Sequence, residues 1–127
     1  MSKDKKTILV IDDEKDELMY YTALLKDNGY NVVSASDGNE GLTKVHEKTP
    51  DLITLDITMP EKSGVKFFRE MKESDTLKSV PIIIITGISG DYEKFISSRK
   101  KIPPPEGFLS KPIDQKELLK LISEILK

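Results

Sequence analysis

The sequence of 127 residues contains no cysteine and only one histidine, His46. Without cysteine there can be no disulfide, thiolate metal site or cysteine nucleophile, and one histidine excludes a site built from several imidazoles. No apolar run approaches the roughly 18 residues that a membrane span needs. The lysine-rich start is not followed by the apolar stretch of a signal peptide. These absences predict a protein of the reducing cytoplasm that does not enter a membrane.

An excess of charge of one sign is also lacking. The 20 basic and 22 acidic residues leave a formal net charge of -2, which excludes the broad basic face that nucleic-acid binding needs. Hydrophobic residues make up 37% and charged residues 33%, a balance typical of a folded globular protein and not of a disordered one. The length suits one domain with a real core and not two. We therefore expect a single domain over residues 1–127.

Short runs of β-branched and aliphatic residues predict five strands. Three of these runs do not alternate apolar with polar residues, so each is expected to be covered on both faces, as in a parallel sheet between helices. The other two runs are more polar or shorter and are expected at the edges of the sheet. In chain order, the predicted strands are residues 7–11, 30–35, 52–55, 80–85 and 107–109.

Helical patterns lie between and after these strands, and several carry recognisable ends. Asn28-Gly29 is a C-terminal stop, and Asp37 and Asp114 each begin a capping box with an acidic residue three positions later. A fourth helix is expected around residues 92–96, ended by three prolines. In the third helix Phe67 and Phe68 are adjacent, so we expect one of them to be half exposed.

The order of elements is strand then helix, five times over. Alternating strands and helices imply a parallel sheet, because right-handed crossovers place helices on both faces. Five units are too few for a closed eightfold barrel. The predicted fold is an α/β, flavodoxin-like doubly wound (βα)5 sheet with strand order 2-1-3-4-5.

Four predicted strands end in polar side chains: Asp12-Asp13, Asp56, Thr86 and Lys111. The first and third strands are neighbours in the predicted order, so three carboxylates are expected to lie close together. At least one carboxylate would stay protonated unless a cation neutralised the group. With no cysteine and no nearby histidine, the ligands are all oxygen, which favours Mg²⁺. The sequence therefore predicts a magnesium site at this edge of the sheet.

A metal ion, a lysine and a hydroxyl around one carboxylate form a cradle for a phosphoryl group on that carboxylate. Asp56 is the carboxylate nearest the middle of the predicted sheet. It is therefore the predicted nucleophile, and Lys111 and Thr86 are expected to face the metal ion across the cleft.

Taken together, these residues resemble the receiver domain of two-component response regulators over essentially the whole chain. The match comprises Asp12-Asp13, Asp56, Met59-Pro60, Gly64, Thr86-Gly87 and Lys111-Pro112. The resemblance implies a phosphoryl-accepting signalling switch without an output domain. It is implied to be no enzyme beyond catalysing its own phosphorylation and dephosphorylation.

The resemblance also implies a role for each matched position. Asp56 would accept a phosphoryl group from a histidine kinase or a histidine phosphotransfer protein. Mg²⁺ would be held by Asp13, Asp56 and the backbone carbonyl of Thr58, with Asp12 acting mainly through water. Lys111 would contact a phosphoryl oxygen, and the Lys111-Pro112 bond is implied to be cis.

The switch residues follow from the same resemblance. Thr86 would move toward the phosphoryl group and Phe108 would enter the space that it leaves. This repacks the face formed by helix 4, strand 5 and helix 5, and so changes the binding of a downstream protein effector. Ile88 cannot position an attacking water, which predicts slow self-dephosphorylation. The Pro103–Pro105 run departs from the family pattern, so the output face is the least transferable part of the resemblance.

Two other functions stay open. A haloacid-dehalogenase-like phosphatase would also use an aspartyl phosphate, but it needs a second acid where this chain has Thr58. A pseudo-receiver that only binds partners would not need the complete set of site residues. His46 on the second helix is interpreted as an exposed helical residue and not as a phosphohistidine.

Overall fold

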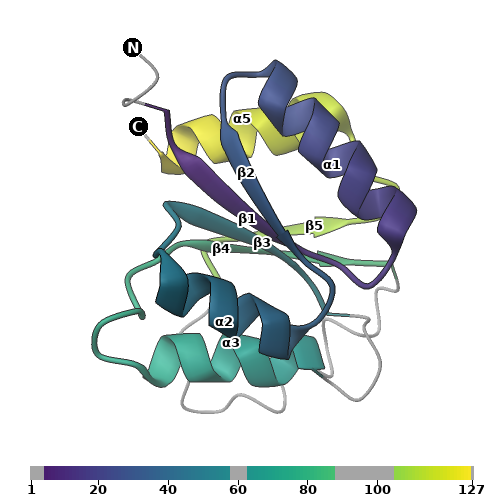
Figure 1. Ribbon diagram of the computed structural model, residues 1–127. Coiled ribbons are helices and arrows are strands. Elements are labelled where there is room, and N and C mark those ends of the chain that lie inside the picture. Colours follow the sequence, from purple (N-terminus) through teal and green to yellow (C-terminus); the bar gives the residue numbers. More distant parts are fainter. Residues whose placement is uncertain (1–4, 58–62, 88–104, 127) are drawn as a thin grey trace.

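A computed structural model describes residues 5–57, 63–87 and 105–126 (Figure 1). Five parallel strands form one sheet in the order β2-β1-β3-β4-β5. Their bounds are β1 (Thr7–Ile11), β2 (Asn31–Ala35), β3 (Leu52–Asp56), β4 (Ile82–Thr86) and β5 (Gly107–Ser110). The predicted flavodoxin-like order is confirmed, and the two strands expected at the edges lie there.

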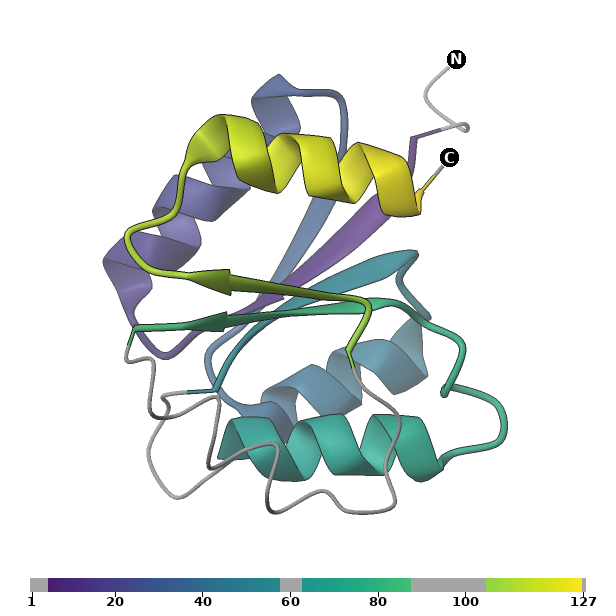
Figure 2. The ribbon, with the colours of Figure 1, turned by 180° about the vertical axis from the view of Figure 1, so that it is seen from behind.

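Helices cover both faces of the sheet. On one face lie α1 (Lys15–Asp27) and α5 (Gln115–Ile125), and on the other lie α2 (Gly38–Glu47) and α3 (Ser63–Glu73) (Figures 1 and 2). The helix expected around residues 92–96 lies outside the described residues. Among the described helices, none is long and apolar enough to cross a membrane.

The uninterrupted apolar runs are explained by two cores, one on each face of the sheet. In β1, Leu9 and Ile11 point into the core under α2 and α3, whereas Ile8 and Val10 point into the core under α1 and α5. The four isoleucines of β4 divide between the two cores in the same way. Since burying one such side chain stabilises the fold by about 1.5–3 kcal/mol, neither face of a central strand tolerates a polar residue easily.

The β4 strand begins two residues later than predicted, at Ile82. Pro81 has no N–H to donate, although its carbonyl accepts a hydrogen bond from the Ile53 N–H at 3.0 Å. The Ile82 N–H donates to the Glu106 carboxylate at 2.8 Å. That carboxylate also holds the buried ammonium of Lys72 at 2.9 Å. This ion pair ties the end of α3 to the residue that precedes β5.

The predicted capping residues are found at the helix ends, with one difference. Asp37 accepts from the Glu40 N–H at 2.7 Å, and Asp114 accepts from the N–H groups of the first turn of α5. The Glu40 carboxylate, however, accepts from the Ser36 N–H at 2.7 Å and not from that of Asp37. Gly29, just after α1, has φ 93°, a backbone conformation that glycine adopts without strain.

The expectation that one of Phe67 and Phe68 is half exposed is wrong, because both rings are buried. The reason is that α3 has two covered sides, one against the sheet and one against α2. A Cβ atom at Gly41 of α2 would lie 3.1 Å from the Phe67 ring and 2.6 Å from Ile11. The glycine therefore lets α2 approach closely enough to cover the Phe67 ring.

Candidate functional site

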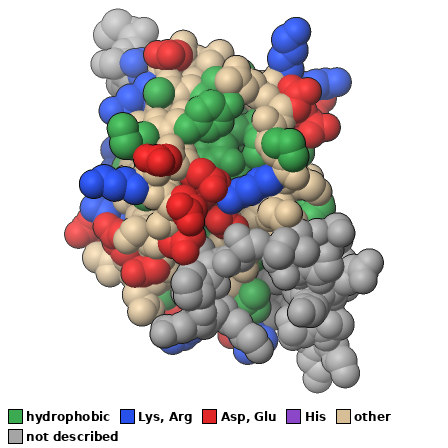
Figure 3. Space-filling model, turned by 90° about the vertical axis from the view of Figure 1, so that its right-hand side faces the viewer, with side chains coloured by type: hydrophobic (Ala, Val, Ile, Leu, Met, Phe, Trp, Pro, Cys, Tyr) green, Lys and Arg blue, Asp and Glu red, His purple; other side chains and the backbone are tan. Residues whose placement is uncertain are grey.

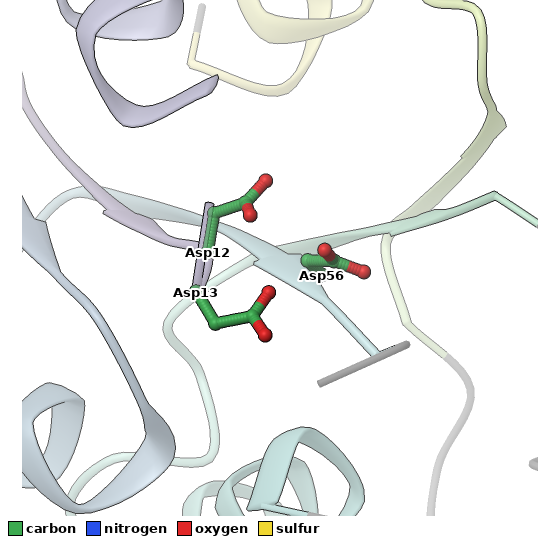
Figure 4. Close-up of side chains that lie close together, drawn as sticks. All are labelled: Asp12, Asp13 and Asp56. Atoms are coloured by element: carbon green, nitrogen blue, oxygen red, sulfur yellow. The ribbon is translucent and has the colours of Figure 1, made fainter. Parts of the chain in front are cut away.

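Three carboxylates meet at the carboxyl edge of the sheet, where β1 and β3 are neighbours. Asp12 and Asp13 follow β1, and Asp56 is the last residue of β3 (Figure 4). One carboxylate oxygen from each lies within 4.8 Å of those of the other two. The backbone fixes Asp12 because its N–H donates to the Ala35 carbonyl at 3.1 Å. Asp12 and Asp56 are buried and Asp13 is exposed, so the cluster opens to solvent on one side.

Lys111 follows the edge strand β5, and its side chain extends from there to this cluster. Its backbone N–H donates to the Thr86 carbonyl at 2.8 Å, which continues the pairing of β4 with β5 beyond the last strand residue. Its Nζ lies 3.3 Å from an Asp56 oxygen and 3.8 Å from an Asp12 oxygen. The peptide bond between Lys111 and Pro112 is cis. On the same face of the molecule, Figure 3 shows acidic side chains gathered around a basic one.

The two residues predicted to switch lie on adjacent strands. Thr86 is the last residue of β4 and is fully buried, with Ser110 of β5 as its partner. Phe108 of β5 is partly buried and packs against the core under α2 and α3. Both residues therefore stand on the β4–β5 side of the acidic cluster.

Other predicted positions lie away from the cluster or cannot be placed. His46 is exposed near the end of α2. Thr58, Met59-Pro60, Ile88 and residues 99–104 lie outside the described residues. The described part of the predicted magnesium site is thus the carboxylate group of Asp12, Asp13 and Asp56.

The pKa of Asp12 shows that Lys111 offsets only part of the negative charge of the cluster. Burial raises the pKa of Asp12 to about 7, and the neighbouring Asp56 and Glu17 carboxylates push it in the same direction. The hydrogen bond from the Glu14 N–H, 2.9 Å long, and the charge of Lys111 act against this rise but do not cancel it. A carboxylate that resists ionisation beside two others fits a site for a hard divalent cation, which would supply the missing positive charge.

Lys111 is held in its charged form by the same acids. Burial acts to lower its pKa, but the carboxylates of Glu17, Asp56 and Asp12 outweigh it and raise the pKa above the usual value. The ammonium therefore stays protonated at any physiological pH. It is a fixed positive charge beside the buried Asp56 oxygen.

One residue of the site was not predicted from the sequence. Glu17 lies in the first turn of α1, and of the acids that the structure describes its carboxylate is the nearest to Lys111, at 2.5 Å. The charge of Glu17 also reaches Tyr21, one turn further along α1, whose pKa is raised mainly by burial. The sequence holds no local signal for this contact, because Lys111 is 94 residues from Glu17 along the chain.

The fold and this cluster define a doubly wound α/β protein with three carboxylates and a lysine at the point where the strand order reverses. Residues 8–123 match the family of response regulator receiver domains. The chain belongs to that family, and the predicted resemblance is confirmed. Receiver domains are signalling modules of two-component systems, and they are not enzymes in the ordinary sense.

Individual relatives agree with this assignment. The chain is 30% identical over 119 residues to protein PilH of Pseudomonas aeruginosa, covering 94% of this chain and 96% of PilH. It is 29% identical to the alkaline phosphatase synthesis transcriptional regulatory protein PhoP of Bacillus subtilis, of which it spans 49%. The solved structure of the chemotaxis protein CheY4 of Vibrio cholerae has a TM-score of 0.83 and 29% identity, covering 96% of this chain and 99% of CheY4.

Proposed function

We propose that the protein is a phosphoryl-accepting signalling switch in which Asp56 receives the phosphoryl group. The observation that carries the proposal is the convergence of Asp12, Asp13 and Lys111 on the buried carboxylate of Asp56. In this arrangement the Asp56 carboxylate lies beside both the proposed cation site and the Lys111 ammonium. The phosphoryl donor is a phosphohistidine of a histidine kinase or a histidine phosphotransfer protein in the cytoplasm.

The transfer forms one bond and breaks one. An oxygen of Asp56 attacks phosphorus, and the bond from phosphorus to the donor nitrogen breaks with its electron pair leaving on the donor imidazole, which takes a proton from solvent. Lys111 contacts a phosphoryl oxygen and offsets its negative charge. Asp12, Asp13, Asp56 and the backbone carbonyl of Thr58 are the proposed holders of Mg²⁺, which supplies further charge neutralisation when bound.

Phosphoryl uptake is expected to depend on the cation. With acetyl phosphate and Mg²⁺ the intact protein should gain one phosphoryl mass, because the cation offsets repulsion between the carboxylates and the donor. With EDTA in place of Mg²⁺, uptake should fall by about 100-fold or more, the scale on which preorganised charge acts at such sites. Intact-protein mass spectrometry over a time course measures both. Equal uptake with and without Mg²⁺ would contradict the proposed cation site.

The proposed switch is local repacking driven by added charge. The phosphoryl group brings about 1.5–2 negative charges and three acceptor oxygens beside the end of β4. Thr86 moves toward these oxygens, and Phe108 moves into the space that Thr86 leaves. The face that includes β5 and α5 then presents a different surface to a downstream protein effector.

A phosphoryl mimic tests this switch. Beryllofluoride with Mg²⁺ is expected to shift the backbone amide NMR signals of Phe108 and its β5 neighbours by more than those of β2, because β2 lies at the far edge of the sheet. Mg²⁺ alone is the control, since it fills the cation site without the mimic. Unchanged signals around Phe108 would rule out the proposed movement.

A further inference from the structure

The ammonium of Lys111 is shared between two groups of acids. Its Nζ lies 2.5 Å from Glu17, compared with 3.3 Å from Asp56 and 3.8 Å from Asp12. Glu17 stands on α1, whereas Asp12 and Asp56 stand at the ends of strands. Among the described residues, therefore, the nearest acid to Lys111 is not the carboxylate predicted to accept the phosphoryl group.

The Glu17 side chain packs its carboxylate against this ammonium. Its Oε1 atom is buried, and the Lys111 ammonium is the charge that lies against it, at 2.5 Å. A buried carboxylate oxygen is costly unless a charge compensates it. The Lys111 ammonium is that charge, and the two side chains are only 34% and 22% exposed. The pair is thus partly shielded from water, and Glu17 competes directly with any new anion for the lysine.

We propose that Glu17 is a positioning residue that holds Lys111 in the unphosphorylated chain and gives it up to the incoming phosphoryl group. This inference rests on the proposed phosphorylation of Asp56. A phosphoryl oxygen must replace Glu17 as the nearest partner of the ammonium, so part of the electrostatic gain from that contact is spent on breaking the existing pair. Glu17 therefore slows phosphorylation.

Replacing Glu17 by glutamine keeps the size of the side chain and removes its charge. At saturating Mg²⁺, we expect E17Q to take up phosphoryl from acetyl phosphate about two- to fivefold faster than the wild type, the range for a partly exposed ion pair. Asp16→Asn is the matched control. Asp16 is exposed in the same turn of α1, and its replacement by asparagine also removes one negative charge. This control should leave the rate within a factor of about 1.5 of the wild type.

A second pair of variants shows whether the effect runs through the lysine. In a Lys111→Met background, the added Glu17→Gln change is expected to give no acceleration. The ammonium for which Glu17 and the phosphoryl group compete is then absent. A purely structural effect of Glu17 would persist in that background and would also shift the thermal midpoint. Circular dichroism melting of each variant is therefore measured beside the rates.

The outcomes separate the inference from the function on which it rests. If the wild type takes up no phosphoryl group, the proposed function fails. If the wild type is phosphorylated but E17Q is no faster than the wild type, only the role of Glu17 is overturned. Equal acceleration by D16N, or the same acceleration in the Lys111→Met background, also overturns that role.

Discussion

Asp56→Asn is expected to abolish phosphoryl uptake entirely, so that the protein keeps its unmodified mass after incubation with acetyl phosphate and Mg²⁺. The amide has the shape of the carboxylate but is a far weaker nucleophile, and of the two buried carboxylates of the cluster Asp56 lies closer to the Lys111 ammonium, at 3.3 Å compared with 3.8 Å for Asp12. Asp56 is 2% exposed at the end of β3. The variant should fold, because an amide has nearly the same size and removes the repulsion between the Asp56 and Asp12 carboxylates.

Asp27→Asn is the matched control for this experiment. Asp27 is an exposed aspartate at the end of α1, and its replacement removes one charge far from the cluster. It should be labelled as fast and as fully as the wild type. Labelling of the Asp56→Asn variant at the wild-type rate would mean that another residue is the acceptor.

The free energy of unfolding is expected to depend strongly on pH because Asp12 is buried. The pKa of Asp12 is raised from 3.8 to about 7 in the folded chain, chiefly by burial. Between these two values the folded state binds more protons than the unfolded state, so the free energy of unfolding falls as pH rises. A tenfold change in an acid's ionisation constant corresponds to about 1.4 kcal/mol, so ionising Asp12 should cost about 2–4 kcal/mol between roughly pH 4 and pH 8.

Asp12→Asn isolates this contribution. The amide oxygen can still accept from the Glu14 N–H but has no charge to desolvate. Urea unfolding without Mg²⁺ should show the variant equal to the wild type near pH 4 and about 2–4 kcal/mol more stable near pH 8. Added Mg²⁺ should stabilise the wild type more than the variant at the higher pH. A constant difference between the two proteins at both pH values would contradict the role given to Asp12.

The sequence was sufficient for the strands, their order and the acidic cluster, and the physical reason is the same in each case. Central strands are buried on both faces, so their residues must be apolar until the strand leaves the sheet. The first polar residues after such runs, Asp12 and Asp56, therefore mark the strand ends. The order of the strands then brings them together.

Contacts between separate elements could not be predicted in this way. The burial of both Phe67 and Phe68 depends on how closely α2 approaches α3 across Gly41. The start of β4 depends on a side chain 24 residues away, that of Glu106. Helical periodicity places Glu17 near the start of α1, but only the fold brings Lys111 to it. The spacing of residues within one helix or strand does not predict such contacts between separate elements.

Asp56 is the residue proposed to carry the phosphoryl group, and locating the modification in the sequence is a direct test of this assignment. An acyl phosphate is reduced by borohydride to an alcohol, which converts the modified aspartate to homoserine. Wild-type protein treated with acetyl phosphate and Mg²⁺, reduced and digested, should yield homoserine at position 56 and at no other position by tandem mass spectrometry. Homoserine at position 12 or 13, or a phosphoryl group on His46, would mean that Asp56 is not the acceptor.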